Sequence, residues 1–236
     1  MASMAEEQRR ALEEAFGASD DDDDDDDGDE HWLLGMERKD EMIPVWESIS
    51  EVNGLWVCRD FLPESRQGWL LSSIHQEGWF HGGSFNQNLL DLFVRAACFH
   101  AGEDHPLPLD LLWREPFFDQ LIVNVYEPGE GICAHVDLMR FDDGIAIVSL
   151  ESTCVMHFTR CKEESEKEGV EEDPSPRVPV LLTPGSLVLL SGEARYLWTH
   201  EINRKPSFQL WGGKEIQQER RTSVTLRKLC SPPNSG

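Results

Sequence analysis

Short runs of apolar and β-branched residues recur from residue 120 to residue 227, and most are separated by glycine, proline, aspartate or serine. There are eight such runs of six or seven residues: QLIVNVY, GICAHVD, IAIVSL, TCVMHFT, VPVLLT, SLVLLS, YLWTHE and RTSVTLR. Regularly spaced strands of this length are typical of a β-sandwich or jelly roll. Helices do not alternate with these runs, so the pattern argues against a Rossmann-type parallel sheet.

The preceding part of the chain has a mainly helical pattern. Residues 53–62 (NGLWVCRDFL) predict one strand that ends ahead of Pro63. A helix is expected over 63–77, because proline is favoured in the first helical turn and apolar residues follow at helical spacing. A second helix is expected over 88–99, where leucine, phenylalanine and alanine recur with the same period. Glycine, aromatic and amide residues at 78–87 predict a loop between the two helices.

Acidic residues are concentrated in two segments that contain few apolar residues. Residues 1–30 hold fourteen acids, including eight consecutive aspartates, and only two bases, and residues 162–177 hold seven acids and three bases. Like charges packed this closely cannot form a core. We therefore expect a disordered acidic tail at 1–40, a helical extension with a lid at 41–119, and a jelly-roll core at 120–229 that carries 162–177 as a mobile loop.

The overall charge limits the classes of protein to which the chain could belong. The formal net charge is −24, which argues against a nucleic-acid binder that works by bulk charge. Residues 193–228 nevertheless hold eight bases against four acids, so an anion would bind there. No apolar run approaches the ~18 residues of a membrane helix, and the N-terminal residues lack the pattern of a signal peptide, so secretion is not expected. Six scattered cysteines without a CxxC pair indicate a reducing compartment, the cytoplasm or nucleus.

The acidic tail is expected to be dispensable for chemistry. Residues 1–30 have no apolar periodicity long enough to dock on a core and no spacing typical of metal ligands. Deleting them should change solubility or association and leave any metal binding and turnover as in the full chain. Metal titration and turnover of the truncated protein check this prediction, and a loss of either would contradict it.

Three residues could bind a metal ion. In the segment HVD, His135 and Asp137 are two positions apart, so on a strand both side chains would lie on the same side. His200, in the later run YLWTHE, could supply the third ligand. Two histidines and one carboxylate on one face of an iron ion leave three positions open for other ligands. An HxD pair is common by chance, so each histidine could instead be an ordinary hydrogen-bonded residue.

The run 221–227 (RTSVTLR) has arginines at both ends of one face. The residues that share this face are Arg221, Ser223, Thr225 and Arg227. Buried arginines need an anion, and each guanidinium can bind a carboxylate through two hydrogen bonds, so a dicarboxylate is a candidate ligand. Asn124 and Tyr126 follow the same alternation on their own run and can donate hydrogen bonds to such a ligand. The alternative is an edge strand whose charged side faces solvent.

Taken in order, these segments resemble the AlkB family of iron(II)- and 2-oxoglutarate-dependent dioxygenases. The resemblance is carried by NVYEPGEGICAHVD, then SGEARYLWTHEI, then RRTSVTLRK, and it is strong over residues 120–228 and loose over 53–119. It implies a double-stranded β-helix, Fe(2+), and 2-oxoglutarate and O2 as cosubstrates. By resemblance the iron ligands are His135, Asp137 and His200. By resemblance the residues that bind 2-oxoglutarate are Asn124, Tyr126, Arg221, Ser223 and Arg227.

The substrate is less clear from the sequence. The segment GEARYLWTHEI is similar to the AlkB branch that hydroxylates a modified wobble uridine in tRNA, which implies a tRNA, other RNA or DNA substrate. By analogy the lid lies within 76–100, where Trp79, Phe85 and Asn86 could contact a nucleobase or could equally pack in the core. Two alternatives remain open: the same oxygenase chemistry on a protein or other non-nucleic-acid substrate, and a non-catalytic jelly-roll binding protein. The oligomeric state is not indicated.

Overall fold

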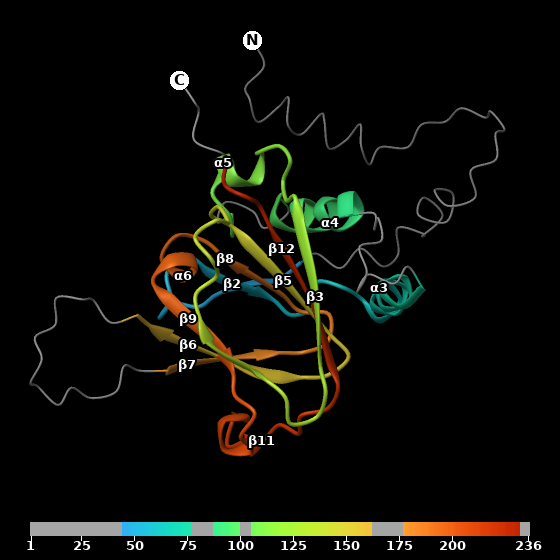
Figure 1. Ribbon diagram of the computed structural model, residues 1–236, viewed down its shortest axis with the longest axis vertical. Coiled ribbons are helices and arrows are strands. Elements are labelled where there is room, and N and C mark those ends of the chain that lie inside the picture. The colour runs from blue at the N-terminus through green and yellow to red at the C-terminus, as the bar shows by residue number, and fades with distance from the viewer. Residues whose placement is uncertain (1–43, 77–86, 100–104, 162–176, 232–236) are drawn as a thin grey trace, which may run out of the picture. The chain divides into compact units, whose positions relative to one another are not determined.

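The computed structural model describes residues 44–76, 87–99, 105–161 and 177–231 (Figure 1). Residues from Met42 onward belong to one compact unit, to which every described residue belongs. The acidic tail, nearly all of the acidic loop, and the lid residues Trp79, Phe85 and Asn86 lie outside the described ranges. The three-region division of the chain and these lid assignments therefore stay predictions.

Two antiparallel sheets form the core of the fold (Figure 1). The larger sheet has the strand order β1-β2-β8-β5-β12-β3 and the smaller one β4-β9-β6-β7. The larger sheet contains β1 (Trp46–Ser48), β2 (Leu55–Cys58), β3 (Gln120–Tyr126), β5 (Ile145–Leu150), β8 (Leu187–Leu190) and β12 (Arg221–Arg227). The smaller sheet contains β4 (Ile132–His135), β6 (Cys154–Arg160), β7 (Arg177–Leu182) and β9 (Trp198–Ile202). The jelly roll expected from the sequence is confirmed.

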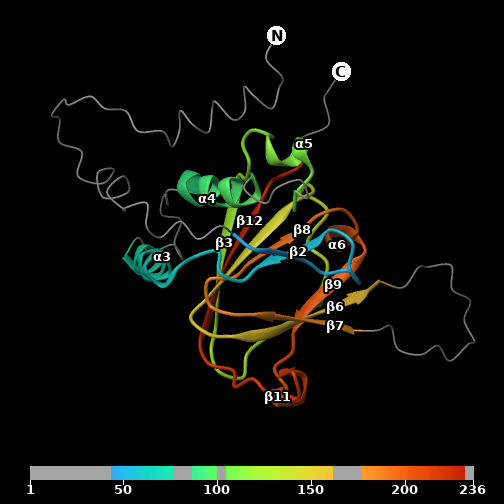
Figure 2. The same cartoon turned by 180° about the vertical axis from the view of Figure 1, so that it is seen from behind.

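The larger sheet is buried on both faces. One face packs against the smaller sheet around Ile145, Val188 and Phe158. The other face packs against α3 (Glu64–Gln76) and α4 (Gln87–Phe99) through residues such as Leu70 and Val94, and Figure 2 shows these helices on the side away from the smaller sheet. Burial on both faces explains why five of the six residues of IAIVSL are apolar rather than every second one.

Most predicted elements are present, and the differences concern short or locally paired segments. Three runs form strands with the expected bounds: β3, β5 and β12. The interpretation of β12 as a solvent-facing edge strand is wrong, because β12 lies between β5 and β3 and all seven of its residues are buried. Six short elements were not predicted: β1, β10 (Leu210–Trp211), β11 (Lys214–Glu215), α5 (Leu109–Leu112), α6 (Gly192–Tyr196) and the 3-10 helix η3 (Pro206–Phe208). In the described part of the chain, no helix has the length and apolar character needed to cross a membrane.

Candidate active site

Two histidines face each other across paired strands. His135 at the end of β4 is the direct antiparallel partner of His200 in β9, and their ring centroids are 4.3 Å apart. The register of this pair shifts between Ile132 and His135, which is the mark of a bulge that re-aims a side chain. On its other side His200 is paired with Phe158 of β6, whose buried ring holds the imidazole in place.

Asp137 completes the cluster from a loop rather than from a strand. β4 ends at His135, so strand alternation does not place the carboxylate. Its Oδ1 accepts a hydrogen bond from Nη1 of Arg227 at 2.6 Å, and its Oδ2 lies 3.8 Å from Nε2 of His200. One ligand atom from each of His135, Asp137 and His200 lies within 4.8 Å of the others. Two imidazoles and one carboxylate at this spacing suit an iron(II) ion with open positions.

The hydrogen-bond geometry of His135 and the pKa of His200 both favour metal binding. Nδ1 of His135 lies 2.8 Å from the carbonyl oxygen of Cys133, so a proton on Nδ1 leaves Nε2 free to coordinate. The pKa of His200 is lowered to about 4, chiefly by burial and next by the neighbouring His135, while Asp137 acts in the opposite direction. A neutral imidazole is the form that ligates a metal.

A cavity of about 200 Å³ lies beside these three side chains. Its polar lining comes from β3, β12 and the cluster: Asn124, Tyr126, His135, Asp137, His200, Arg221, Ser223, Thr225 and Arg227. Its apolar lining is Ile122, Ile132, Ile147, Met156 and Ile202. The structure thus brings together all eight of the residues expected to bind the metal or 2-oxoglutarate. It adds the apolar wall, which the sequence analysis missed although Ile122 shares a strand face with Asn124 and Tyr126.

The two arginines of β12 have unused hydrogen-bond donors in this cavity wall. Nε of Arg221 donates to Oγ of Ser149 at 3.0 Å, but its Nη2 is buried and has no partner among the described residues. Nε of Arg227 is buried in the same way. Buried donors without acceptors are costly, so this wall suits an anionic ligand. A five-carbon dicarboxylate such as 2-oxoglutarate therefore fits the residues present.

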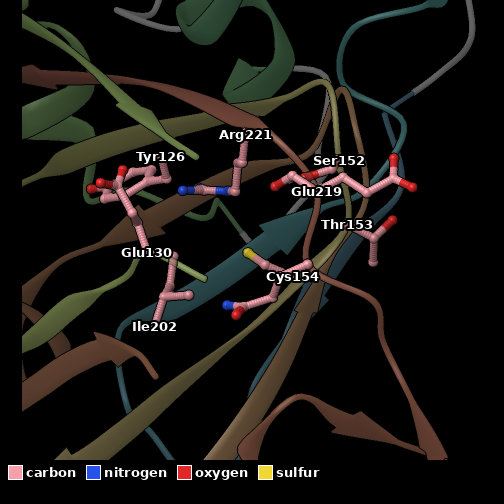
Figure 3. A pocket seen from close by; sticks show the side chains of 9 residues that line it. Tyr126, Glu130, Ser152, Thr153, Cys154, Ile202, Glu219 and Arg221 are labelled. Carbon is pink, nitrogen blue, oxygen red and sulfur yellow. The ribbon is translucent and has the colours of Figure 1, made fainter. Parts of the chain in front are cut away.

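Arg221 also lines a second, smaller cavity (Figure 3). Figure 3 shows the Arg221 side chain extending toward Tyr126, with the sulfur of Cys154 below it. This cavity measures about 10 Å³, which is room for about one water molecule. Arg221 therefore borders both cavities, together with Tyr126.

Comparison with known proteins decides the family. Residues 85–227 match the family model described as the 2OG-Fe(II) oxygenase superfamily. The chain belongs to this superfamily. It is 28% identical over 225 residues to an Arabidopsis thaliana protein named "Alkylated DNA repair protein ALKBH8 homolog", covering 83% of this chain and 64% of that one. It is 32% identical over 217 residues to the Mus musculus protein "tRNA (carboxymethyluridine(34)-5-O)-methyltransferase ALKBH8", covering 76% of this chain and 31% of that one.

The fold agrees with these relatives. The structure of OsALKBH1 superimposes with a TM-score of 0.50 and 15% sequence identity, covering 74% of this chain and 96% of that one. The protein is thus an AlkB-type 2-oxoglutarate-dependent dioxygenase, as the motif order predicts. The chain spans less than two thirds of the length of the Arabidopsis and mouse proteins.

The residues of this chain can be given roles around the family's cofactors, Fe(2+) and 2-oxoglutarate. His135, Asp137 and His200 would hold the iron, which supplies the activation of O2 and the oxidation of the substrate. Arg227 marks the metal end of the cavity because it is bonded to Asp137, so Arg221 would bind the far carboxylate of 2-oxoglutarate. The isoleucines and Met156 would keep water from the reacting atoms.

Proposed function

We propose that this dioxygenase oxidises an alkyl group on a nucleic acid, with tRNA favoured. The observation that carries the proposal is the similarity, over 76–83% of this chain, to proteins whose names refer to tRNA and to alkylated DNA. The mouse name describes a methyltransferase, but this chain covers 31% of that protein and contains an oxygenase domain. The support for the proposal is therefore limited to the reference to a nucleic acid that the two names have in common.

The exposed basic residues within 193–228 all lie in the segment that connects β9 to β12. Of the eight bases in that range, three are buried in or beside the active site: Arg195, Arg221 and Arg227. Two more are engaged in ion pairs, Arg220 with Glu151 and Lys228 with Asp119. The remaining three, Arg204, Lys205 and Lys214, are exposed. The exposed basic surface of this segment is therefore limited to residues 203–219.

An aromatic side chain accompanies these exposed bases. Trp211 is 37% exposed beside the Gly212–Gly213 turn of the β10–β11 hairpin, and Lys214 follows it. Buried Gln209 fixes the base of the hairpin, because its side chain bonds both the N–H and the carbonyl of Val155. Exposed aromatics stack on unpaired bases and lysines bind phosphates, so this hairpin suits a single-stranded or looped nucleic acid.

Charge reversal on this hairpin should weaken tRNA binding. Lys205→Glu and Lys214→Glu are each expected to raise the Kd for tRNA several-fold at low salt and to reduce its salt dependence, because each removes a phosphate contact. Arg160→Glu is the control: it makes the same change in charge at the end of β6, five residues or about 17 Å from Val155, where Arg160 is paired with Glu193. Filter binding over a salt series measures the effect. Equal changes in all three variants would point to bulk charge and contradict the assignment.

The decisive experiment measures the product. The purified protein is incubated with tRNA, Fe(II), 2-oxoglutarate and O2, and the nucleosides are then analysed by mass spectrometry with succinate measured in parallel. An oxidised or dealkylated nucleoside is the expected result. The second candidate is a protein or other non-nucleic-acid substrate, which the net charge of −24 favours. Succinate formation with no change in any nucleoside would reject the nucleic-acid proposal and favour this second candidate.

A further inference from the structure

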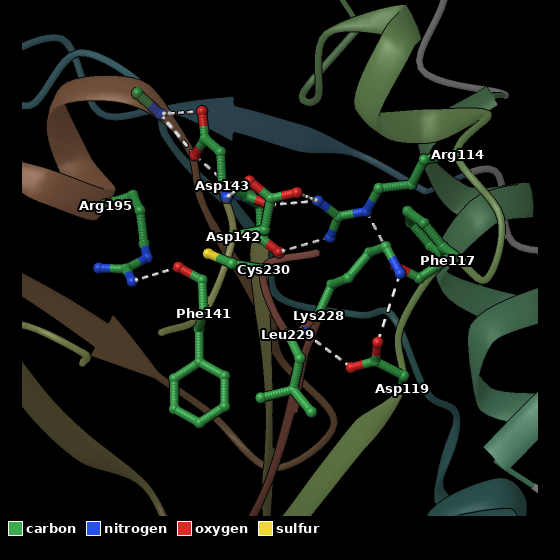
Figure 4. A network of polar contacts seen from close by, with 12 residues as sticks. Arg114, Phe117, Asp119, Phe141, Asp142, Asp143, Arg195, Lys228, Leu229 and Cys230 are labelled. Carbon is green, nitrogen blue, oxygen red and sulfur yellow. Dashed lines mark hydrogen bonds and ion pairs between the residues drawn. The ribbon is translucent and has the colours of Figure 1, made fainter. Parts of the chain in front are cut away.

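Arg195 lies beside the metal cluster without being part of the cavity lining. It belongs to α6 (Gly192–Tyr196), is 2% exposed, and is among the largest fully buried side chains of the described residues. Its Nη1 donates to the carbonyl oxygen of Asp137 at 3.0 Å, and its Nη2 donates to those of Leu138 and Phe141, both at 2.9 Å. Figure 4 shows the contact with Phe141. One guanidinium therefore holds three carbonyls of the loop that follows β4.

We propose that Arg195 is a positioning residue for the metal ligand Asp137, an inference that rests on the iron-binding role given to Asp137 above. Arg195 fixes the backbone of Asp137 while Arg227 fixes its carboxylate, so the ligand is held at both ends. Arginine suits this task because its donors form a rigid planar fork, which sets the directions of several acceptors at once.

The position of Arg195 in the chain links two ligand segments. α6 ends at Tyr196 and β9, which carries His200, begins at Trp198. The same short segment therefore supplies the third ligand and, through Arg195, holds the second. This arrangement fixes the distance between Asp137 and His200 independently of the cavity contents.

The loop has few other means of holding Asp137. Leu138 and Met139 directly after it are 60% and 64% exposed, so apolar packing begins only at Phe141. No carboxylate of the described residues forms an ion pair with Arg195, whose charge is compensated by carbonyl dipoles. A buried cation of this kind is a poor choice for stability alone, since apolar residues of similar volume are often as stable. The three hydrogen bonds from Arg195 to the loop that carries Asp137 explain why an arginine is buried here.

A second arginine provides a matched control (Figure 4). Arg114 also donates to three backbone carbonyls, those of Phe117, Asp143 and Gly144, and so holds the far end of the same loop. It contacts neither Asp137 nor either histidine in the described residues. If Arg114 and Arg195 affected metal binding only by stabilising the fold, replacing either of them would weaken metal binding to the same extent.

The test measures metal binding by the metal-free protein, without turnover. Co(II) is titrated into the wild type, Arg195→Lys, Arg195→Met, Arg114→Lys and Asp137→Ala, and visible absorption gives both the Kd and the coordination spectrum. Loss of groups that orient metal ligands typically weakens binding by about 10–100-fold. We expect that range for both Arg195 variants together with an altered spectrum, and a change below about threefold with an unaltered spectrum for Arg114→Lys. Thermal unfolding of the metal-free proteins is recorded alongside.

Three outcomes would overturn the proposal. The first is wild-type affinity and spectrum in the Arg195 variants, and the second is an equal loss in Arg114→Lys. The third is failure of both Arg195 variants to fold, which would make Arg195 a purely structural residue. The Asp137→Ala variant tests the metal assignment separately. If Asp137→Ala no longer binds Co(II) and Arg195→Lys binds it as the wild type does, the assignment of Asp137 as a ligand is supported and the positioning role of Arg195 is rejected. None of these measurements depends on the proposed nucleic-acid substrate.

Discussion

Replacing Asp137 with alanine is expected to abolish iron(II) binding and turnover of 2-oxoglutarate. The change leaves two neutral imidazoles for a dication and removes the only carboxylate of the cluster. The expected loss of activity exceeds about 100-fold, because changes to groups that merely orient a ligand already cost up to that factor. Anaerobic iron titration and succinate formation measure the two effects. Wild-type iron affinity in this variant would show that the metal site is elsewhere.

The same change has a cost in stability that the sequence does not reveal. Asp137 is 8% exposed and bonded to Arg227, itself 9% exposed, so alanine leaves a mostly buried guanidinium without its partner. Removing one member of a buried ion pair typically costs about 3–5 kcal/mol. Asp137→Asn keeps the shape and one acceptor oxygen, so it should lose iron with a smaller loss in the free energy of unfolding. Urea unfolding of the two metal-free variants compares them, and equal stability would show that the pair contributes little.

Strand periodicity accounts for the part of the site that was predictable. Arg221, Ser223 and Arg227 share a cavity wall because β12 alternates without interruption, and Asn124 and Tyr126 share the adjacent wall for the same reason on β3. In the register of the sheet, Asn124 pairs with Ser223 and Tyr126 with Arg221. Local periodicity and antiparallel pairing were therefore enough to bring these five residues together.

The position of Asp137 could not be derived in this way. The HxD spacing was interpreted as two residues on one strand, but β4 ends at His135. The backbone carbonyl of Asp137 is bonded to Arg195 and its carboxylate to Arg227, which lie 58 and 90 residues away in the chain. Asp137 was therefore included in the cluster by the sequence analysis, but strand alternation was an incomplete reason for doing so. Contacts over such separations leave no local pattern in a single sequence.

Charge counting failed for a related reason. Lys228 was counted as a free base, yet its Nζ lies 3.3 Å from Oδ2 of Asp119. Arg195 was counted among the bases of the segment and is buried. A sum of charges along a segment does not distinguish bases that face solvent from those that hold a loop or close an ion pair. Short strands such as β1 and β10 were missed similarly, because two or three residues become a strand only through their pairing partner.

Replacing Arg221 with lysine is expected to raise the concentration of 2-oxoglutarate needed for half-maximal turnover by about tenfold or more, equivalent to about 1.4 kcal/mol. Lysine keeps the positive charge but loses the planar fork that can bind a carboxylate through two hydrogen bonds. In the wild type, Nε of Arg221 is held by Ser149 while Nη2 has no partner in the described structure, so the guanidinium is already oriented for a ligand. Arg227→Lys should behave similarly, with an added loss of iron affinity through Asp137.

Arg220→Lys is the control for these variants. Arg220 is adjacent in sequence, but it pairs with Glu151 and Glu127 and does not line the larger cavity, so its replacement should leave the 2-oxoglutarate requirement unchanged. Binding to the folded state alone raises the unfolding temperature, which gives a second measurement: added 2-oxoglutarate should stabilise the wild type and Arg220→Lys more than Arg221→Lys. If neither Arg221→Lys nor Arg227→Lys changes the apparent affinity or this stabilisation, the cosubstrate does not bind along β12. The unused donors of both arginines would then need a different anion to explain them.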